Sequence, residues 1–180
     1  MISAAGRFLE WLLEWVTIIL MVGLTLVVIV AVLFRLAGDS LSWYDEVAAI
    51  QLSWVTYYGA ALAALKRRHI GFDTVLLSIP MPFRMAALVL AETIVLGFFY
   101  LLTDTGLTVL DVLEGEYLVS LTWVPIQFTQ SVIPIGAALF ILCEIISLPE
   151  YWRMTARGRS LEHAEIEEEV ETELSKAGRA

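Results

Sequence analysis

The sequence of 180 residues contains a single cysteine, Cys143, and only two histidines, His69 and His163. One cysteine excludes a disulfide within the chain and argues against a thiol oxidoreductase built on four helices. Both histidines lie outside the long apolar runs, so a haem-binding helical bundle would lack its usual axial ligands. No Walker A motif, serine-hydrolase elbow or metal-ligand spacing is present. We therefore predict no catalytic residue, no cofactor and no metal site.

Basic residues are also scarce, since 11 lysines and arginines stand against 20 aspartates and glutamates, for a net charge of −9. This acidic balance, with the basic residues scattered in short clusters, disfavours binding to nucleic acid. Much of the acidity is local, because seven glutamates lie between Glu162 and Glu173. We expect residues 156–180 to form an acidic tail, which is either a solvated segment or an acidic amphipathic helix over Leu161–Leu174.

Apolar residues are abundant, at 59% of the chain with a mean hydropathy of +0.78, whereas soluble domains contain roughly 45–50%. Four runs are long enough to span a hydrocarbon core, which requires about 20 residues. The expected transmembrane helices cover residues 14–35, 45–66, 84–104 and 118–149. The sequence therefore predicts an all-α integral membrane protein whose four-helix domain occupies residues 1–155.

The first apolar run and the distribution of basic residues predict the topology. Val16–Phe34 carries no charge and exceeds the apolar region of about 7–15 residues of a signal peptide, so we interpret it as a retained helix. If the N-terminus is inside, ten of the 11 lysines and arginines lie in inner segments and only Arg35 lies outside. Because basic residues accumulate on the cytoplasmic side, both termini and the acidic tail should be cytoplasmic.

The stretch of residues 42–73 has acids near its start and basic residues near its end. Ser42 can cap the second helix, with Asp45 as its capping-box partner. Asp45 and Glu46 fall in the first turn, where the helix dipole favours anions, and Trp43 suits the membrane interface. This pattern predicts a transmembrane helix with charged ends and not an active site.

A few residues inside the spans indicate packing or coupling. Gly59 and Ala63 are spaced to let another helix approach closely, and Pro134 should kink or locally open the fourth helix. Glu92 is an intramembrane acid that serves either ion coupling or an ion pair or hydrogen bond at a helix interface. Glu144 lies near the inner end of its span. No pair of related halves with broken helices is evident, so the chain looks too small to transport a substrate alone.

Several short motifs follow one another in order between residues 8 and 150. They are Phe34-Arg35, Ser42-Trp43-Tyr44-Asp45-Glu46, Gly59-Ala60-Ala61, His69-Ile70-Gly71-Phe72-Asp73, Ile79-Pro80, Trp123-Val124-Pro125 and Ile133-Pro134-Ile135-Gly136. In this order and spacing, within four spans, the chain resembles the small membrane subunit of tripartite ATP-independent periplasmic (TRAP) transporters, the DctQ-like family.

This resemblance implies a multi-pass protein of a bacterial inner membrane and not an enzyme. Its partners would be a large TRAP membrane subunit, which carries the substrate, and a periplasmic solute-binding protein. Uptake would be driven by an ion gradient, usually of sodium, and the substrate would be an organic acid such as a dicarboxylate or a sugar acid. The ligands for substrate and ion would belong to the large subunit, so we expect none here.

The family-like positions that carry over are Arg35, Trp43, Asp45, Glu46, His69 and Asp73. We expect Trp43, Asp45 and Glu46 to anchor the outer end of the second helix, and His69 and Asp73 to shape the inner loop. The alternative is that all six are ordinary residues of the membrane interface. Two other functions stay open: a membrane enzyme or redox subunit, and a structural or signalling tetraspan protein whose acidic tail recruits a cytoplasmic partner.

Overall fold

The structure is a computed structural model that describes residues 4–67 and 79–156. Its helices are α1 (Ala4–Leu36), α2 (Tyr44–Leu65), α4 (Met81–Val112), α5 (Ile126–Gln130) and α6 (Val132–Ala156). Four segments are long and apolar enough to cross a membrane: Gly6–Leu36, Tyr44–Leu65, Met81–Val112 and Ile126–Ala156. Across these described residues, extended pairing is limited to one isolated bridge between Tyr117 and Pro125. The predicted all-α class with four candidate spans is confirmed for this part of the chain.

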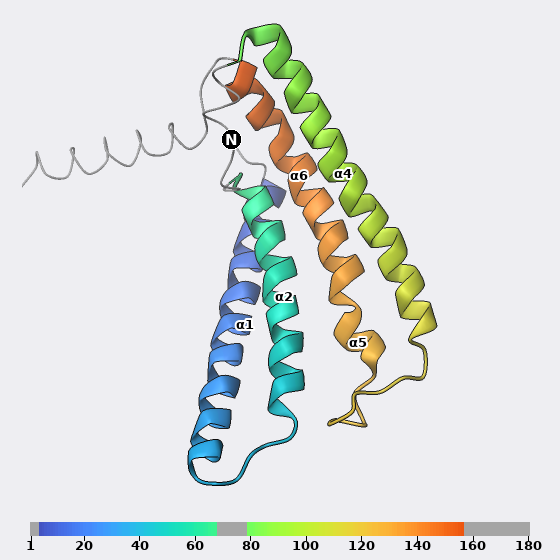
Figure 1. Cartoon of the computed structure of the whole chain (residues 1–180). Coiled ribbons are helices and arrows are strands. Elements are labelled where there is room, and N and C mark those ends of the chain that lie inside the picture. The colour runs from blue at the N-terminus through green and yellow to red at the C-terminus, as the bar shows by residue number, and fades with distance from the viewer. Residues whose placement is uncertain (1–3, 68–78, 157–180) are drawn as a thin grey trace, which may run out of the picture.

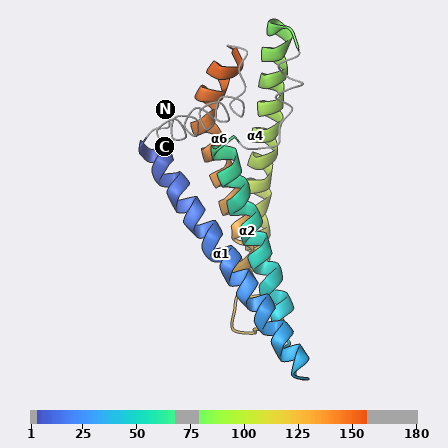
Figure 2. The ribbon, with the colours of Figure 1, turned by 90° about the vertical axis from the view of Figure 1, so that its left-hand side faces the viewer.

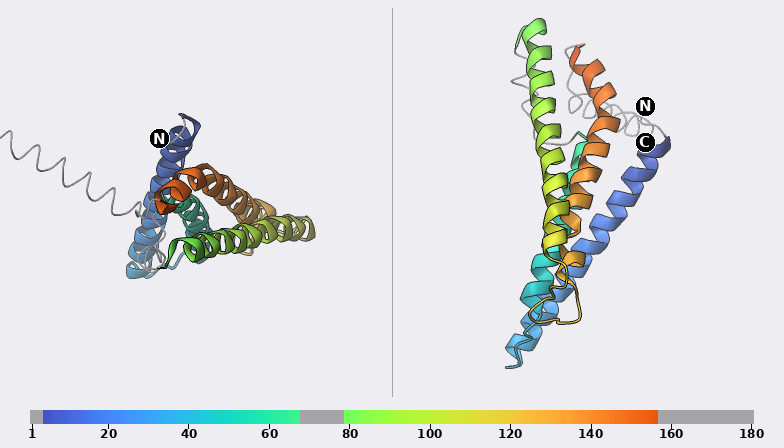
Figure 3. Two further views of the ribbon diagram at one scale, coloured as in Figure 1. Left: turned by 90° about the horizontal axis from the view of Figure 1, so that it is seen from above. Right: turned by 90° about the vertical axis from the view of Figure 1, so that its right-hand side faces the viewer.

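The central pair of the fold is α2 and α6, which pack against each other along their lengths (Figure 1). α1 packs on α2, and α4 packs on α6, while no comparable interface joins α1 to α4 in the described residues. Figure 2 shows α1 crossing the other helices obliquely, with its first turns standing apart from α4. In the view from above in Figure 3, α1, α6 and α4 outline a triangle with α2 inside it.

Because the chain crosses the molecule four times, the same end holds the start of α1, the end of α2, the start of α4 and the end of α6 (Figure 1). We call this the Arg67 end, after the residue that closes the turn behind α2. The opposite end holds the start of α2 and the loop between α4 and α5, and we call it the Glu46 end. Ala4 and Ala156 therefore lie at the same end of the molecule, as an even number of spans requires.

The fourth span begins later than residue 118, where the sequence led us to expect it. Pro125 occupies the N-cap position of α5 with φ −67° and ψ 137°, and a residue before proline, such as Val124, is disfavoured in helical geometry. The preceding segment instead closes on itself, since Leu118 N–H donates to Val124 C=O at 3.1 Å and Ile126 N–H donates to Glu116 C=O at 2.9 Å. α6 in turn extends past residue 149 to Ala156.

The break between α5 and α6 falls at Ser131, three residues before Pro134, which agrees with the predicted opening of the fourth helix. A proline has no N–H, so the carbonyl of Gln130, four residues earlier, cannot receive a helical hydrogen bond from it. Pro134 falls in the first turn of α6, a position where the missing donor is harmless, and regular bonding resumes with Ile135 N–H to Ser131 C=O at 3.2 Å.

The predicted capping box at Ser42 is wrong. α2 begins at Tyr44, so Trp43 occupies the N-cap position, and no side chain caps the helix there. Ser42 lies one residue too early in the chain for its hydroxyl to serve the first helical amides, which a cap residue must reach. Asp45 and Glu46 do fall in the first turn of α2.

Close approach of the helices depends on two glycines, one in α6 and one in α4. A Cβ added to Gly136 of α6 would lie 2.6 Å from the Cβ of Tyr57 on α2. A Cβ added to Gly106 of α4 would lie 3.1 Å from Cδ of Pro134. Both distances are shorter than ordinary van der Waals contacts, so these glycines set the separation of α2 from α6 and of α4 from α6.

Nearer the Arg67 end, a cluster of buried apolar residues joins α1, α2 and α6. Its buried members are Leu13, Ala61, Ala64, Leu65, Phe140 and Cys143. The ring of Phe140 stacks on that of Phe99 from α4, with centroids 3.7 Å apart. The outward sides of α1 and α4, in contrast, expose large apolar side chains such as Ile19 and Leu90. Surfaces of this kind are suited to lipid.

Candidate functional site

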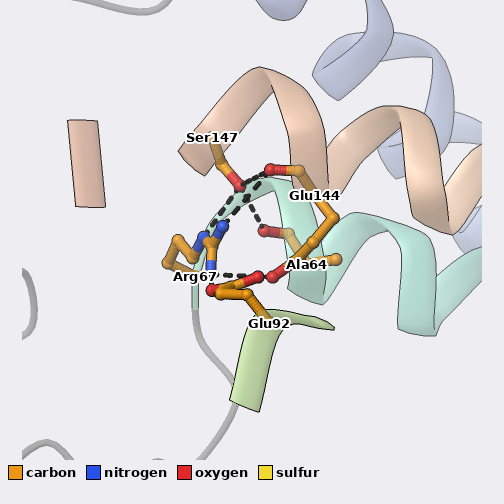
Figure 4. A network of polar contacts seen from close by, with 5 residues as sticks. All are labelled: Ala64, Arg67, Glu92, Glu144 and Ser147. Carbon is orange, nitrogen blue, oxygen red and sulfur yellow. Dashed lines mark hydrogen bonds and ion pairs between the residues drawn. The ribbon is translucent and has the colours of Figure 1, made fainter. Parts of the chain in front are cut away.

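A buried polar cluster at the Arg67 end is the most elaborate arrangement of charges in the described residues. Arg67 follows α2 and has φ +50°, a left-handed conformation that side-chain-bearing residues rarely adopt. Its N–H donates to Ala64 C=O at 3.2 Å, which closes the turn. Figure 4 shows its guanidinium lying between Glu92 of α4 and Glu144 of α6.

The guanidinium of Arg67 binds both carboxylates through one nitrogen. Its Nη1 lies 2.6 Å from Oε1 of Glu92 and 2.7 Å from Oε1 of Glu144. Its Nη2 donates to the backbone carbonyl of Glu144 at 3.2 Å. The side chains of Arg67, Glu92 and Glu144 are only 10%, 12% and 5% exposed. The three helices α2, α4 and α6 therefore meet at one shielded ion cluster.

Two further residues of α6 complete the surroundings of Arg67. Nε of Arg67 donates to Oγ of Ser147 at 2.8 Å, and the guanidinium lies 4.6 Å from the centroid of the Tyr151 ring. The hydroxyl of Ser147 reaches two carbonyls, that of Ala64 at 3.2 Å and that of Glu144 at 3.1 Å. Arg67 is thus held by carboxylates, a hydroxyl, a carbonyl and an aromatic face at once.

This cluster explains Glu92 and Glu144 and adds a residue that sequence reasoning missed. Glu92 was expected to serve ion coupling or an ion pair between helices, and the observed contacts are those of the ion pair. The sequence distinguishes Arg67 in no way from the other basic residues near the end of residues 42–73. One sequence signal could have indicated Arg67. The spans contain two acids, Glu92 and Glu144, and buried acids require a cation as partner.

A second ion cluster at the same end joins α1 to α2. Nζ of Lys66 lies 3.2 Å from Oε1 of Glu10 and also forms an ion pair with Glu14. The hydrogen bond to Glu14 raises the pKa of Lys66 above the ordinary 10.5, with a further contribution from Glu10 and an opposing one from partial burial. Lys66 and Arg67 are adjacent in sequence but bind acids on different helices.

Arg84, near the start of α4, adds a third connection at this end. Its Nε donates to Ile79 C=O at 3.2 Å, and its Nη1 donates to Thr155 C=O of α6 at 3.4 Å. These bonds join the first turn of α4 to the last turn of α6.

At the Glu46 end, the carboxylate of Glu46 holds the loop that connects α4 to α5. It accepts hydrogen bonds from Val119 N–H at 3.0 Å and Ser120 N–H at 2.9 Å, and another from the hydroxyl of Ser120. These contacts fit the predicted anchoring role of Glu46. The anchor works through the loop of residues 117–125, for which the sequence had predicted helix from residue 118.

The other family-like residues at this end have simpler surroundings. Arg35 donates to the hydroxyl of Tyr44, and its guanidinium lies 5.6 Å from the centroid of that ring. This pair connects the end of α1 to the start of α2. Trp43 is half-buried, whereas Asp45 is exposed.

Two hydrogen bonds position the short helix α5 between α2 and α4. Nε1 of Trp54 on α2 donates to Thr129 C=O at 2.9 Å, and Nε2 of Gln127 donates to Leu110 C=O of α4 at 2.8 Å. α5 therefore supplies a polar connection between helices that have no long common interface.

The spacing of Gly59 and Ala63 predicts a closely approaching helix, and no helix among the described residues approaches Gly59 in this way. A Cβ added to Gly59 would meet no atom within 4 Å, and Ala63 is half-buried. The close approaches occur instead at Gly136 and Gly106. The two remaining predicted residues, His69 and Asp73, lie outside the described residues.

The chemistry available at these clusters is structural. Residues 4–67 and 79–156 contain no group of three or more His, Cys, Asp or Glu side chains that could hold a metal ion. Cys143 is a free, buried cysteine in the apolar cluster. The polar groups described above bind one another across helix interfaces. Together with four helices long and apolar enough to cross a membrane, they define the chain as a small helical membrane protein.

Comparison with known families gives a more specific identification. The family model described as "Tripartite ATP-independent periplasmic transporters, DctQ component" matches residues 24–154, which is more than half of the chain. The chain belongs to the DctQ family, the small membrane component of TRAP transporters. The resemblance predicted from the order of the sequence motifs is thereby confirmed. No curated protein matches the chain.

Proposed function

We propose that this chain is the accessory membrane subunit of a TRAP transporter in a bacterial inner membrane. Its partners are a large membrane subunit and a periplasmic solute-binding protein, and the complex takes up an organic acid, such as a dicarboxylate or a sugar acid, driven by a sodium gradient. The chain supports the large subunit and carries no substrate itself. Membership of the DctQ family supports the tripartite assembly.

The observation that carries the supporting role is the outward face of α2. Its exposed side chains form one stripe at helical spacing, and all but one of them are small or polar. The stripe consists of Asp45, Ala49, Leu52, Ser53 and Thr56, and Leu52 is its one large apolar side chain. Gly59 and Ala63 continue the same stripe toward the Arg67 end.

A stripe of this composition is poorly suited to lipid and well suited to another helix. Transmembrane helices approach closely where small residues and hydroxyls face each other. The outward sides of α1 and α4 differ, since they expose large apolar side chains such as Ile19 and Leu90, each more than 60% exposed. We therefore assign the α2 stripe to the contact with the large subunit, and the outward sides of α1 and α4 to lipid.

The orientation that we propose places the Arg67 end in the cytoplasm. The described basic residues at that end are Arg7, Lys66, Arg67, Arg84 and Arg153, against Arg35 alone at the other end. Such a bias is typical of cytoplasmic ends. Reporter fusions at Gly38 and Gly115 should give a periplasmic signal, and a fusion at Ala180 a cytoplasmic one. A periplasmic signal at Ala180 would overturn this orientation.

The assignment of the α2 stripe is tested by co-purification in mild detergent. Gly59→Leu places a large side chain where the large subunit should approach, so recovery of the large subunit should fall several-fold. Gly97→Leu on α4 is the matched control, because a Cβ there also meets no atom within 4 Å. If Gly97→Leu reduces recovery and Gly59→Leu does not, the contact lies on α4 and the assignment is wrong.

The accessory role is tested by uptake into liposomes under an inward sodium gradient. Uptake of a labelled organic acid should require this chain, the large subunit and the loaded binding protein together. Replacing sodium by potassium should abolish it. Uptake by this chain alone would refute the accessory role, and uptake that is independent of sodium would refute the proposed coupling ion.

A further inference from the structure

The ion cluster at Arg67 has an imbalance of charge. One guanidinium stands against the carboxylates of Glu92 and Glu144, so the group carries a net charge of −1 if both acids are ionised. An uncompensated charge is strongly disfavoured where the surroundings are apolar. The side chain of Glu144 is only 5% exposed.

Each of the two carboxylates also has one buried oxygen atom without a hydrogen-bond partner. Each carboxylate gives its Oε1 to Arg67, while the Oε2 atoms of Glu92 and Glu144 are both buried without a hydrogen-bond partner. Figure 4 shows the two carboxylates pointing toward each other beside the guanidinium. Buried polar atoms almost always have a hydrogen-bond partner in native proteins. We therefore expect a hydrogen-bond donor between the two Oε2 atoms.

We propose that Glu92 and Glu144 bind one proton, which they share between their Oε2 atoms at neutral pH. The proton supplies the missing donor to both oxygens and reduces the charge of the cluster to zero. Two carboxylates held together in a shielded site commonly keep one proton between them. Ionising both would cost free energy, because the two negative charges repel each other.

A bound metal cation would neutralise the charge equally but does not fit the site. Oxygen-binding cations require about six or more ligands, and the buried side-chain oxygens without a partner at this cluster are two, the Oε2 atoms of Glu92 and Glu144. The carbonyls of Glu144 and Ala64 are already engaged by Arg67 and Ser147. A shared proton needs only two oxygen atoms, and the Oε2 atoms of Glu92 and Glu144 can bind it.

The charged and titratable groups around this site come from each of the helices that pack there. They are Arg67 behind α2, Glu92 on α4, and Cys143, Glu144 and Tyr151 on α6. The next basic residue along the chain, Lys66, is bound to Glu10 and Glu14 of α1. Arg67 is thus the only described cation that contacts either carboxylate.

Proton sharing predicts a specific response to pH. The folded state keeps a proton that the unfolded chain has released, so stability falls as the pH rises through the point where the cluster loses it. Below that point α4 and α6 are joined through Arg67 and the proton. Above it, a second negative charge opposes the first and weakens the junction of α4 with α6.

The test is infrared spectroscopy of the full chain in lipid nanodiscs, labelled with ¹³C at its glutamate carboxyl carbons, which separates protonated carboxyl groups from carboxylates. The wild type should show a protonated-carboxyl band at about pH 7 that disappears at alkaline pH. Glu92→Gln and Glu144→Gln should each abolish the band, because the remaining carboxylate then pairs one-to-one with Arg67. Glu114→Gln, at an exposed glutamate of the opposite end, should leave it unchanged.

Three results would overturn the proposal. The first is the absence of the band in the wild type at about pH 7. The second is its survival in either glutamine variant, which would indicate a single protonated acid instead of a shared proton. The third is its loss on addition of sodium, which would indicate a metal cation at the site. If one variant fails to fold, the wild type with and without sodium and the other variant still decide the matter.

The thermal unfolding midpoint gives a second readout. A glutamine has the shape of a protonated glutamate and its amide can donate to the remaining Oε2. Glu92→Gln should therefore match the wild type at acidic pH, where the unfolded wild-type chain is protonated as well, and should unfold at a higher temperature than the wild type as the pH rises. Equal midpoints for both proteins across the whole pH range would contradict proton release from this cluster.

Discussion

Replacement of Gly136 by alanine tests whether the separation of α2 from α6 depends on the absence of a side chain. The new Cβ would lie 2.6 Å from the Cβ of Tyr57, whereas ordinary contacts begin at 3.4 Å. The two backbones must therefore move apart by about 0.8 Å, the difference between these distances. The Cβ of Tyr57 is fixed to the backbone of α2, so no rotation of its side chain relieves the clash.

The expected loss follows from the cost of overpacking, which is about 1–3 kcal/mol for a methyl group inserted into a filled interface. Alanine also has a better helix propensity than glycine by up to about 1 kcal/mol, which partly offsets the loss. Gly97→Ala on α4 is the matched control, because its new Cβ meets no atom within 4 Å. Since the propensity gain is common to both variants, Gly136→Ala should be less stable than Gly97→Ala by about 1–3 kcal/mol.

The assay is equilibrium unfolding of both variants and the wild type in detergent, followed by circular dichroism. Gly97→Ala should be as stable as the wild type or slightly more stable, and Gly136→Ala clearly less stable than its control. If the two variants unfold together, the short distance at Gly136 is relieved without cost and the packing argument is refuted.

Three more predictions concern the polar connections. Arg67→Ala leaves two buried acids without their cation and should destabilise the chain by about 3–5 kcal/mol in the same unfolding assay; a loss below about 1 kcal/mol would contradict a buried ion cluster. Glu46→Ala removes the acceptor of the loop amides, so hydrogen exchange at residues 119–120 should accelerate several-fold, while exchange in α6 stays unchanged. Lys66→Met should be less stable than wild type at neutral pH. The hydrogen bond to Glu14 raises the pKa of Lys66, so Lys66 stays charged until the pH rises above 10.5. The stability contributed by its ion pairs is kept over the same pH range. A stability difference that already disappears at about pH 8 would contradict this ion pair.

The architecture was largely predictable because lipid imposes a simple rule on sequence. Long apolar runs form helices in a bilayer, as every backbone polar group must be satisfied within its own segment. The class, the number of candidate spans and the family followed from such runs and from motif order. The boundary at Ile126 did not, because the apolar residues of 118–125 satisfy a hydropathy criterion whether they form a helix or a loop. Pro125 was the available signal for the loop.

The partners of the charged residues were the part that sequence could not supply. Three successive basic residues follow α2, and nothing in their order says that Lys66 binds α1 while Arg67 binds α4 and α6. That choice depends on the left-handed turn at Arg67 and on which helices pack there. In the same way, the sequence suggests close packing at Gly59, and only the packed structure shows that Gly136 meets Tyr57.

The separate partners of Lys66 and Arg67 have a consequence for the biogenesis of this protein. Chains are synthesised from the N-terminus, so Lys66 finds Glu10 and Glu14 already present when α2 enters the membrane. Arg67, its neighbour, must wait until Glu92 and then Glu144 have been made, about 77 residues after Arg67 itself. The ion pairs between α1 and α2 can thus form before the rest of the chain is made. Arg67 then binds the second half of the chain through Glu92 and Glu144. A ribosome stalled before Glu144 would hold a stable α1–α2 pair whose arginine is still exposed to the insertion machinery.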